Sequence, residues 1–95
     1  MPVNATQPLN SGATVTTTSA LLVAGNSARS KLAIVNTGAY NVYLSKGVPA
    51  VVGKGIMIAA NGGSTSYQDL NNWLGAIYAI ADGGSSITTY LEEYI

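Results

Sequence analysis

The fold of this chain is decided by the stretch KLAIVNTGAYNVYLS, residues 31–45. It contains two short runs, Lys31–Asn36 and Asn41–Ser45, in which aliphatic residues recur at every second position. Successive side chains of a β-strand point to opposite faces, so this period predicts two strands with one buried face each. The connection Thr37–Tyr40 is short and contains Gly, which is typical of a β-hairpin. The core residues predicted from this stretch are Leu32, Ile34, Val42 and Leu44.

The same pattern continues through the chain from Thr14 onward. β-Branched residues and tyrosines come in short runs separated by Gly and Asn, which is typical of an all-β sandwich or barrel. The further predicted strands are Thr14–Val23, Ile56–Ala60, Ser64–Tyr67, Gly75–Ala81 and Ser86–Leu91. The first is long enough to bend or to split in two. We therefore predict a small antiparallel β-sandwich or barrel of about seven strands. The further predicted core residues are Ile77, Ala79 and Ile87.

The beginning of the chain differs from the rest. Residues 1–13, MPVNATQPLNSGA, hold two Pro and a Ser-Gly pair and show no strand or helix period. We expect an extended N-terminal arm over residues 1–13 and a single β-sandwich domain over residues 14–95. The arm is either a free terminus or a segment that becomes ordered on a neighbouring subunit.

Glycines mark the predicted turns and loops. Asn61-Gly62-Gly63 and Asp82-Gly83-Gly84 combine residues that tolerate a positive φ, so each is expected to turn the chain between strands. Residues 46–55, KGVPAVVGKG, are expected to form a surface loop. Its exposed valines would have to be covered by another surface. Between Tyr67 and Gly75 we expect a loop that carries Trp73.

The composition excludes several kinds of partner. Only 8% of the residues are charged, 47% are hydrophobic, and the formal net charge is zero. Without a basic run, the chain has no electrostatic footprint for nucleic acid or for an anionic membrane. Zero net charge lowers the repulsion between copies. We therefore expect a homo-oligomer, with a trimer favoured, or obligate binding to another protein.

The residues needed for common catalytic sites are missing. The chain has no His and no Cys, which removes the usual catalytic triads, thiolate metal sites and the commonest metal ligand. The adjacent acids Glu92 and Glu93 point to opposite faces of any strand that includes them. Arg29 and Lys31 are expected on a solvated strand edge. We predict no enzyme, no cofactor and no metal site.

The aromatic residues are the candidates for a binding surface. There are six Tyr and one Trp but no Phe. Tyr and Trp combine a large apolar body with a polar tip, a profile enriched where a protein meets a partner. Tyr43 and Tyr78 stand within apolar runs and are expected to pack in or around the core. The predicted interface residues lie near strand ends or in the C-terminal tail and are Tyr67, Trp73, Tyr90, Leu91, Tyr94 and Ile95.

Several motifs together resemble a known group of proteins. They are Ala24-Gly-Asn-Ser-Ala-Arg29, Leu32-Ala-Ile-Val-Asn-Thr-Gly38, Val42-Tyr-Leu44, Gly55-Ile56, Ala60-Asn-Gly-Gly-Ser64 and Gly75-Ala-Ile-Tyr-Ala-Ile80. In order and spacing they resemble small structural proteins of tailed phages, over about residues 20–90. The resemblance implies a β-sandwich attached to a phage head, fibre or tail.

The resemblance implies a virion role, and three functions stay open. The first is a capsid decoration or cement protein that binds the major capsid protein at the capsid surface after synthesis in the host cytoplasm. The second is another virion component, such as a head-fibre base, a neck or a tail module. The third is a carbohydrate-binding sandwich that uses Trp73 and tyrosines as stacking platforms. The chain contains no long fibre repeats, which favours the first function.

Overall fold

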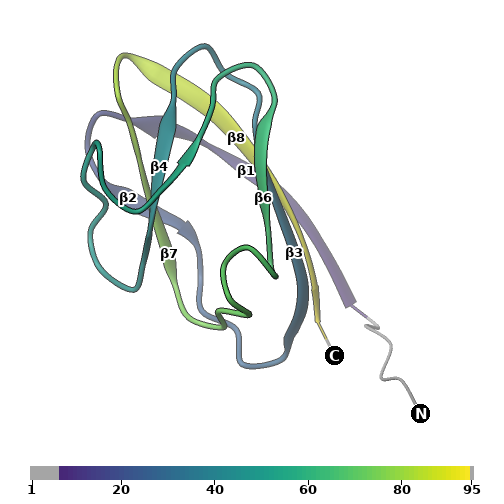
Figure 1. Cartoon of the computed structure of the whole chain (residues 1–95). Coiled ribbons are helices and arrows are strands. Elements are labelled where there is room, and N and C mark those ends of the chain that lie inside the picture. The colour runs from purple at the N-terminus through teal and green to yellow at the C-terminus, as the bar shows by residue number, and fades with distance from the viewer. Residues whose placement is uncertain (1–6, 95) are drawn as a thin grey trace.

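The chain forms a sandwich of two antiparallel four-stranded sheets (Figure 1). The computed structural model describes residues 7–94. The strands in this part of the chain are β1 (Gln7–Thr16), β2 (Ala20–Val23), β3 (Arg29–Asn36), β4 (Val42–Lys46), β5 (Ile56–Ile58), β6 (Gly63–Ser66), β7 (Ile77–Ala81) and β8 (Ser85–Tyr94). Sheet A has the strand order β1-β8-β3-β6, and sheet B has the order β2-β7-β4-β5. The predicted all-β sandwich is confirmed, and residues 7–94 include no helix capable of spanning a membrane.

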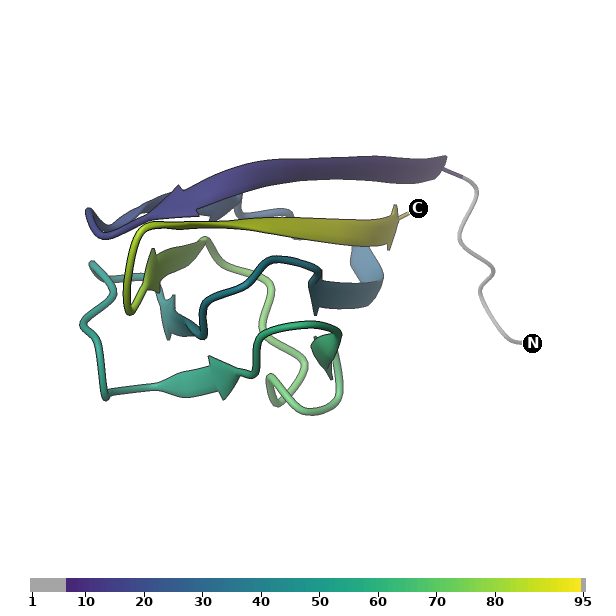
Figure 2. The same cartoon turned by 90° about the horizontal axis from the view of Figure 1, so that it is seen from above.

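Most connections pass from one sheet to the other. Among consecutive strands, β4 and β5 alone are paired within the same sheet, and each of the other connections within residues 7–94 crosses between the layers. Figure 2 shows the two layers side by side, and the strands of each layer follow one another from the top of the picture to the bottom. The predicted turns at Asn61–Gly63 and Asp82–Gly84 are two of these crossings, with positive φ at Asn61, Gly62 and Gly84.

The hairpin predicted for residues 31–45 is wrong. Both strands exist, but β3 pairs with β6 and β8 in sheet A, while β4 pairs with β5 and β7 in sheet B. The buried Asn36 side chain makes the corner between them. Its amide nitrogen donates to the carbonyls of Tyr40 (2.7 Å) and Ile58 (3.1 Å), and its oxygen accepts from Gly38 N and Ser86 Oγ. A Cβ at Gly38 would collide with Ser86, so Gly lets the corner pass close to β8.

The core lies between the two sheets and includes most of the residues that the alternating hydrophobic pattern predicted. Six of the seven predicted core residues are buried, namely Leu32, Ile34, Val42, Leu44, Ile77 and Ala79. Leu70, in the loop after β6, is also fully buried and was not predicted. It closes the end of the sandwich because the Leu70 amide donates to the Ser66 carbonyl and curls this loop inward.

The core position predicted for Ile87 is wrong, because this side chain is 57% exposed. The inner face of β8 is polar and carries Ser86, Thr88 and Glu92, all buried. Ser86 and Glu92 bond to side chains of β3. A shift of one residue would bring Ile87 inward but would break these bonds. The polar contacts therefore determine which face of β8 is buried, and they override its hydrophobic pattern.

The predicted arm also needs correction. Residues 7–13 are the first part of β1, which pairs with β8 in an unbroken register from Gln7↔Tyr94 to Thr16↔Ser85. The backbone can join the sheet despite the lack of a hydrophobic period, because β1 is an edge strand whose side chains are largely exposed over residues 9–16. Residues 1–6 lie outside the described part of the chain. The predicted split of Thr14–Val23 is confirmed, since β1 and β2 are separate strands.

The Asn36 corner predicts a large effect on stability. Replacing Asn36 by Leu, which is similar in volume, leaves the buried carbonyl of Ile58 and the amide of Gly38 without their partner, while the Tyr40 carbonyl keeps the Ser86 hydroxyl. Each group left without a partner costs about 1–3 kcal/mol, so we expect the free energy of unfolding to fall by at least about 2 kcal/mol. Urea denaturation checks this value. Ser64→Ala, at an exposed position of the same sheet, is the control, and equal losses for both variants would contradict the role of the corner.

Candidate functional site

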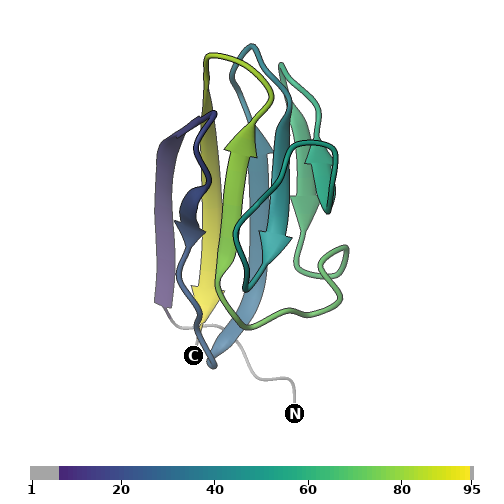
Figure 3. The same ribbon diagram turned by 90° about the vertical axis from the view of Figure 1, so that its left-hand side faces the viewer.

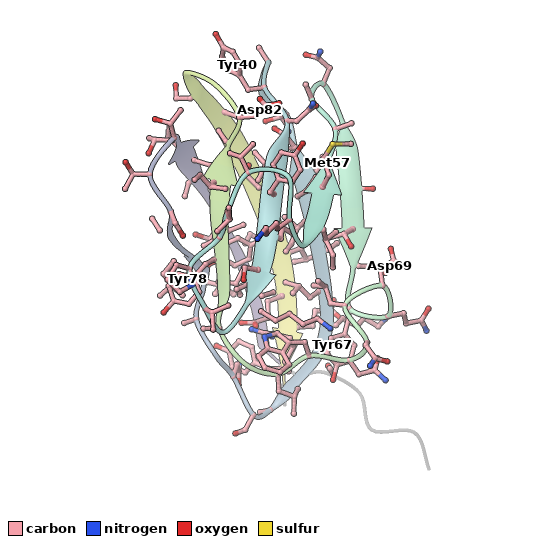
Figure 4. The ribbon with its side chains drawn as sticks, turned by 60° about the vertical axis from the view of Figure 1, so that its left-hand side comes forward. Tyr40, Met57, Tyr67, Asp69, Tyr78 and Asp82 are labelled. Carbon is pink, nitrogen blue, oxygen red and sulfur yellow. The ribbon has the colours of Figure 1, made fainter. Side chains whose placement is uncertain are left out.

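The acidic side chains of residues 7–94 are spread over separate parts of the sandwich. Within residues 7–94, no three His, Cys, Asp or Glu side chains are placed to hold a metal ion. Asp69 and Asp82 are exposed on separate loops and lie well apart (Figure 4). Glu92 is buried and Glu93 is half-buried on the other face of β8, as their adjacency predicts.

The buried Glu92 is engaged in an ion pair with Arg29. Arg29 Nε lies 2.5 Å from Glu92 Oε2, and the two side chains are 0% and 4% exposed. The predicted position of Arg29 on a solvated edge is therefore wrong, whereas Lys31, two residues later, is exposed. The guanidinium also donates to the carbonyls of Ala24, Trp73 and Gly75. The pair joins β3 and β8 of sheet A to the segments that flank β2 and β7 of sheet B.

Two of the predicted interface residues, Tyr67 and Trp73, lie in the loop between β6 and β7. Both are half-buried and pack against the core. The Trp73 indole N–H donates to the Ala76 carbonyl (2.9 Å), and Lys46 Nζ lies 5.8 Å from the centre of the ring. Tyr67 also lines a shallow depression of about 290 Å³ beside the start of β3. Much of each ring is therefore already in contact with other residues of the protein.

The other predicted interface residues belong to the C-terminal strand. Tyr90 and Tyr94 are half-buried, and Tyr90 packs against the core. Leu91 is exposed on the outer face of sheet A, in a depression of about 240 Å³ that it shares with Ala33, Val35 and Thr89. Ile95 lies outside the described residues. The structure therefore spreads the predicted set over several surfaces and does not form one patch from it.

A larger apolar surface lies on the outer side of sheet B. Leu21 faces Tyr78 across the β2–β7 pair, and Met57 faces Tyr43 across the β4–β5 pair. Tyr43 and Tyr78 alternate with buried residues in their strands, so their side chains point outward, and Leu21 and Met57 are exposed opposite them. Figure 4 looks onto this side of the molecule and labels Tyr78 and Met57 there. Leu21 and Met57 are each 51% exposed, which leaves substantial apolar area uncovered.

The loop between β4 and β5, residues 47–55, lies over this side of sheet B. Figure 3 shows it passing in front of β4. The Ala50 amide donates to Ser19 Oγ at 2.7 Å, and Ala50 itself is buried, so the loop is fixed to the sheet near the start of β2. Its three valines point the other way. Val48, Val51 and Val52 are 59%, 51% and 46% exposed, as the sequence predicted for this loop.

We call the outward residues of sheet B together with this loop the apolar face, comprising Leu21, Tyr43, Met57, Tyr78, Ile80 and residues 47–55. It contains one charged residue, Lys54. Beside Lys54, the loop and Ser45 form a depression of about 230 Å³ lined mainly by Val48, Pro49 and Val51. Exposed, clustered apolar side chains with few charges are the composition of protein-binding surfaces. This arrangement is suited to contact with another protein.

At the sequence level only the loop of the apolar face was expected to need a partner, because the other members come from four separate strands. The valines of residues 47–55 were expected to be exposed, but nothing in their spacing shows that Leu21 and Met57 lie on the same side. The usable signal was a loop with three valines and no acidic residue between Gly47 and Gly55.

Comparison of the chain with protein-family models, with curated proteins and with solved structures finds no match in any of the three.

The two cations of β3 provide a matched pair for measuring the buried ion pair. Arg29→Met leaves the Glu92 carboxylate buried without its cation and also removes the donor to three carbonyls. We expect the free energy of unfolding to fall by about 3–5 kcal/mol. Lys31→Met removes a cation that is 78% exposed and 4.0 Å from Glu93, so its effect should stay within about 0.5 kcal/mol. Similar losses in the two variants, measured by urea denaturation, would contradict this account.

Proposed function

We propose that this protein is a non-enzymatic structural component of a tailed-phage virion that decorates or cements the capsid by binding the major capsid protein. The virion context comes from the resemblance of residues 20–90 to small phage structural proteins. The observation that carries the binding role is the apolar face. It presents several half-exposed aliphatic side chains beside a single charged residue, Lys54, on one side of the sandwich.

Covering the apolar face contributes favourable free energy to attachment. Fully burying a Val, Leu or Met side chain contributes about 1.5–3 kcal/mol. The five most exposed aliphatic side chains of the face are Leu21, Val48, Val51, Val52 and Met57, each about half exposed. Covering what remains exposed would contribute about 4–7 kcal/mol in total, before the costs of association. Many copies on one shell then add to the stability of the particle through repeated contacts.

The loop makes the face suitable for a fixed partner. Residues 47–55 are tied to sheet B through Ala50 and Ser19, so little ordering is required when a partner covers the valines. At its end, Gly55 has a φ of 80°, and a Cβ there would collide with the Leu44 carbonyl. This close approach fixes the return of the loop into β5. A preformed loop lowers the entropic cost of binding.

A head-fibre base, a neck protein or a tail module would use the same kind of contact. Copy number distinguishes these functions, because a cement protein is present in near-stoichiometric ratio to the capsid subunit and a tail module in few copies. The carbohydrate-binding alternative depends on a free aromatic platform. Trp73 is half-buried, its N–H is bonded to Ala76, and Lys46 lies over its ring, all of which argue against that use.

Charges placed on the apolar face test the proposal. Val48→Asp/Val51→Asp puts two unpaired carboxylates into the proposed contact, at exposed positions where folding should tolerate them. We expect affinity for capsid shells stripped of this protein to fall at least tenfold, measured by co-sedimentation, with an unchanged melting temperature. Ser27→Asp/Ser64→Asp adds the same charge elsewhere and should bind as the unmodified protein does.

Three results would count against the proposal. Equal binding by both double variants would remove the apolar face from the contact. Failure of the unmodified protein to bind shells, together with a low copy number in purified particles, would favour a neck or tail module. Selective binding to a glycan array that is lost in Trp73→Ala would favour the carbohydrate-binding function.

A further inference from the structure

The strand β1 leaves a long edge of sheet A without a partner among the described residues. It runs from Gln7 to Thr16 and pairs on one side with β8 along its whole length. On the other side it is the last strand of the sheet order. Figures 2 and 3 both show β1 along a margin of the molecule. Ten residues is long for a free edge, since strands in globular proteins average about five or six.

The hydrogen bonds of β8 show which groups of β1 face outward. The Ile87 carbonyl accepts from Thr37 N on the β3 side, so Ile87 and every second residue from it direct their backbone groups toward β3. The residues between them, including Thr88, direct theirs toward β1. Their partners in β1 are the odd-numbered residues, such as Ala13 opposite Thr88. The N–H and C=O groups of Asn10, Gly12 and Thr14 therefore point away from the sheet.

Most of the usual protections of an edge strand are absent from the middle of this edge. Natural sheets guard such edges with charged side chains, bulges or proline. β1 has no charged residue, and its register with β8 has no bulge over the whole strand. Its single proline, Pro8, lies near the beginning and leaves the N–H groups of Asn10, Gly12 and Thr14 in place. The described outer face of β1 carries small or short polar residues, namely Asn10, Gly12, Thr14 and Thr16.

We propose that β1 pairs with β1 of a second copy of this chain, antiparallel and around a two-fold axis at Gly12. A two-fold axis through an antiparallel pair places one residue opposite its own copy. Residues that lie directly opposite each other point to the same face of the sheet. Centring on Gly12 places Asn10 opposite Thr14 of the second copy, and the reverse. The outward N–H groups of Asn10, Gly12 and Thr14 in each copy then meet outward carbonyls of the other.

The second copy fits this edge for reasons of charge and shape. An uncharged strand meets no like charge when it pairs with itself, and the net charge of the whole chain is zero. Gly12 has no side chain at the axis, where the two copies approach most closely. The paired edges join two four-stranded sheets into one continuous sheet. The expected species is a dimer, formed without the apolar face and independently of the proposed attachment to a capsid.

A backbone variant tests whether β1 forms the contact. Asn10→Pro removes an N–H that points outward and leaves the bonds to β8 intact, as proline is tolerated on free edges. Asn10→Ala is the matched control, because it keeps that N–H. In sedimentation equilibrium of the purified protein, we expect a dimer for the unmodified protein and for Asn10→Ala. Asn10→Pro should weaken the dimer at least a hundredfold.

A pair of charge variants tests the register and does not depend on folding of the proline variant. Asn10→Lys/Thr14→Lys places lysine opposite lysine in both halves of the contact and should weaken the dimer about tenfold. Asn10→Lys/Thr14→Glu places opposite charges there and should keep the dimer. Mixing the Lys/Lys variant with Asn10→Glu/Thr14→Glu should restore a mixed dimer. Equal dimerisation of the Lys/Lys and Lys/Glu variants would overturn the pairing, as would an unmodified protein that is monomeric at tens of micromolar or trimeric.

Discussion

The two sheets are held together by the buried guanidinium of Arg29 at the start of β3. It pairs with Glu92 of β8 and donates to carbonyls beside β2 and β7, so one side chain connects both layers. Asn36 does the same at the other end of β3, where it bonds to the chain around β4, to Ile58 of β5 and to Ser86 of β8. The eight residues of β3 separate these clusters by about 25 Å. Aliphatic packing fills the space between them, and the polar clusters select the register in which it packs.

The fold class followed from the sequence because the period of two in β3, β4 and β7 reflects real burial. The arrangement of strands did not, since a short Gly-containing connection suits a hairpin and a sheet crossing equally well. The difference depends on Asn36, whose side chain bonds to Gly38 and Tyr40 nearby and also to Ile58 and Ser86, which are distant in the sequence. Ile87 was misplaced for the same reason. Its strand buries Ser86 and Glu92 to satisfy partners on β3, and hydrophobic pattern alone cannot reveal that preference.

The candidate binding surface was less predictable than the core. Tyrosines and Trp73 were expected at an interface from their residue type, yet Tyr67, Trp73 and Tyr90 pack partly against the core. The most exposed apolar side chains are instead aliphatic residues of sheet B and its long loop, together with Ile87 on sheet A. Their grouping depends on strand order and register, which are tertiary properties. What the sequence did predict is the chemistry of this surface, because with 8% charged residues little charge is available to cover a sandwich of this size.

The central claim is that the apolar face attaches this protein to other protein subunits of a virion. A cryo-electron microscopy reconstruction of the particle whose genome encodes the chain tests it most directly. The account predicts sandwich-shaped density in many copies on the capsid, with residues 47–55 and Met57 turned toward the major capsid protein. Density that turns these residues to solvent, or particles that lack the protein altogether, would contradict it.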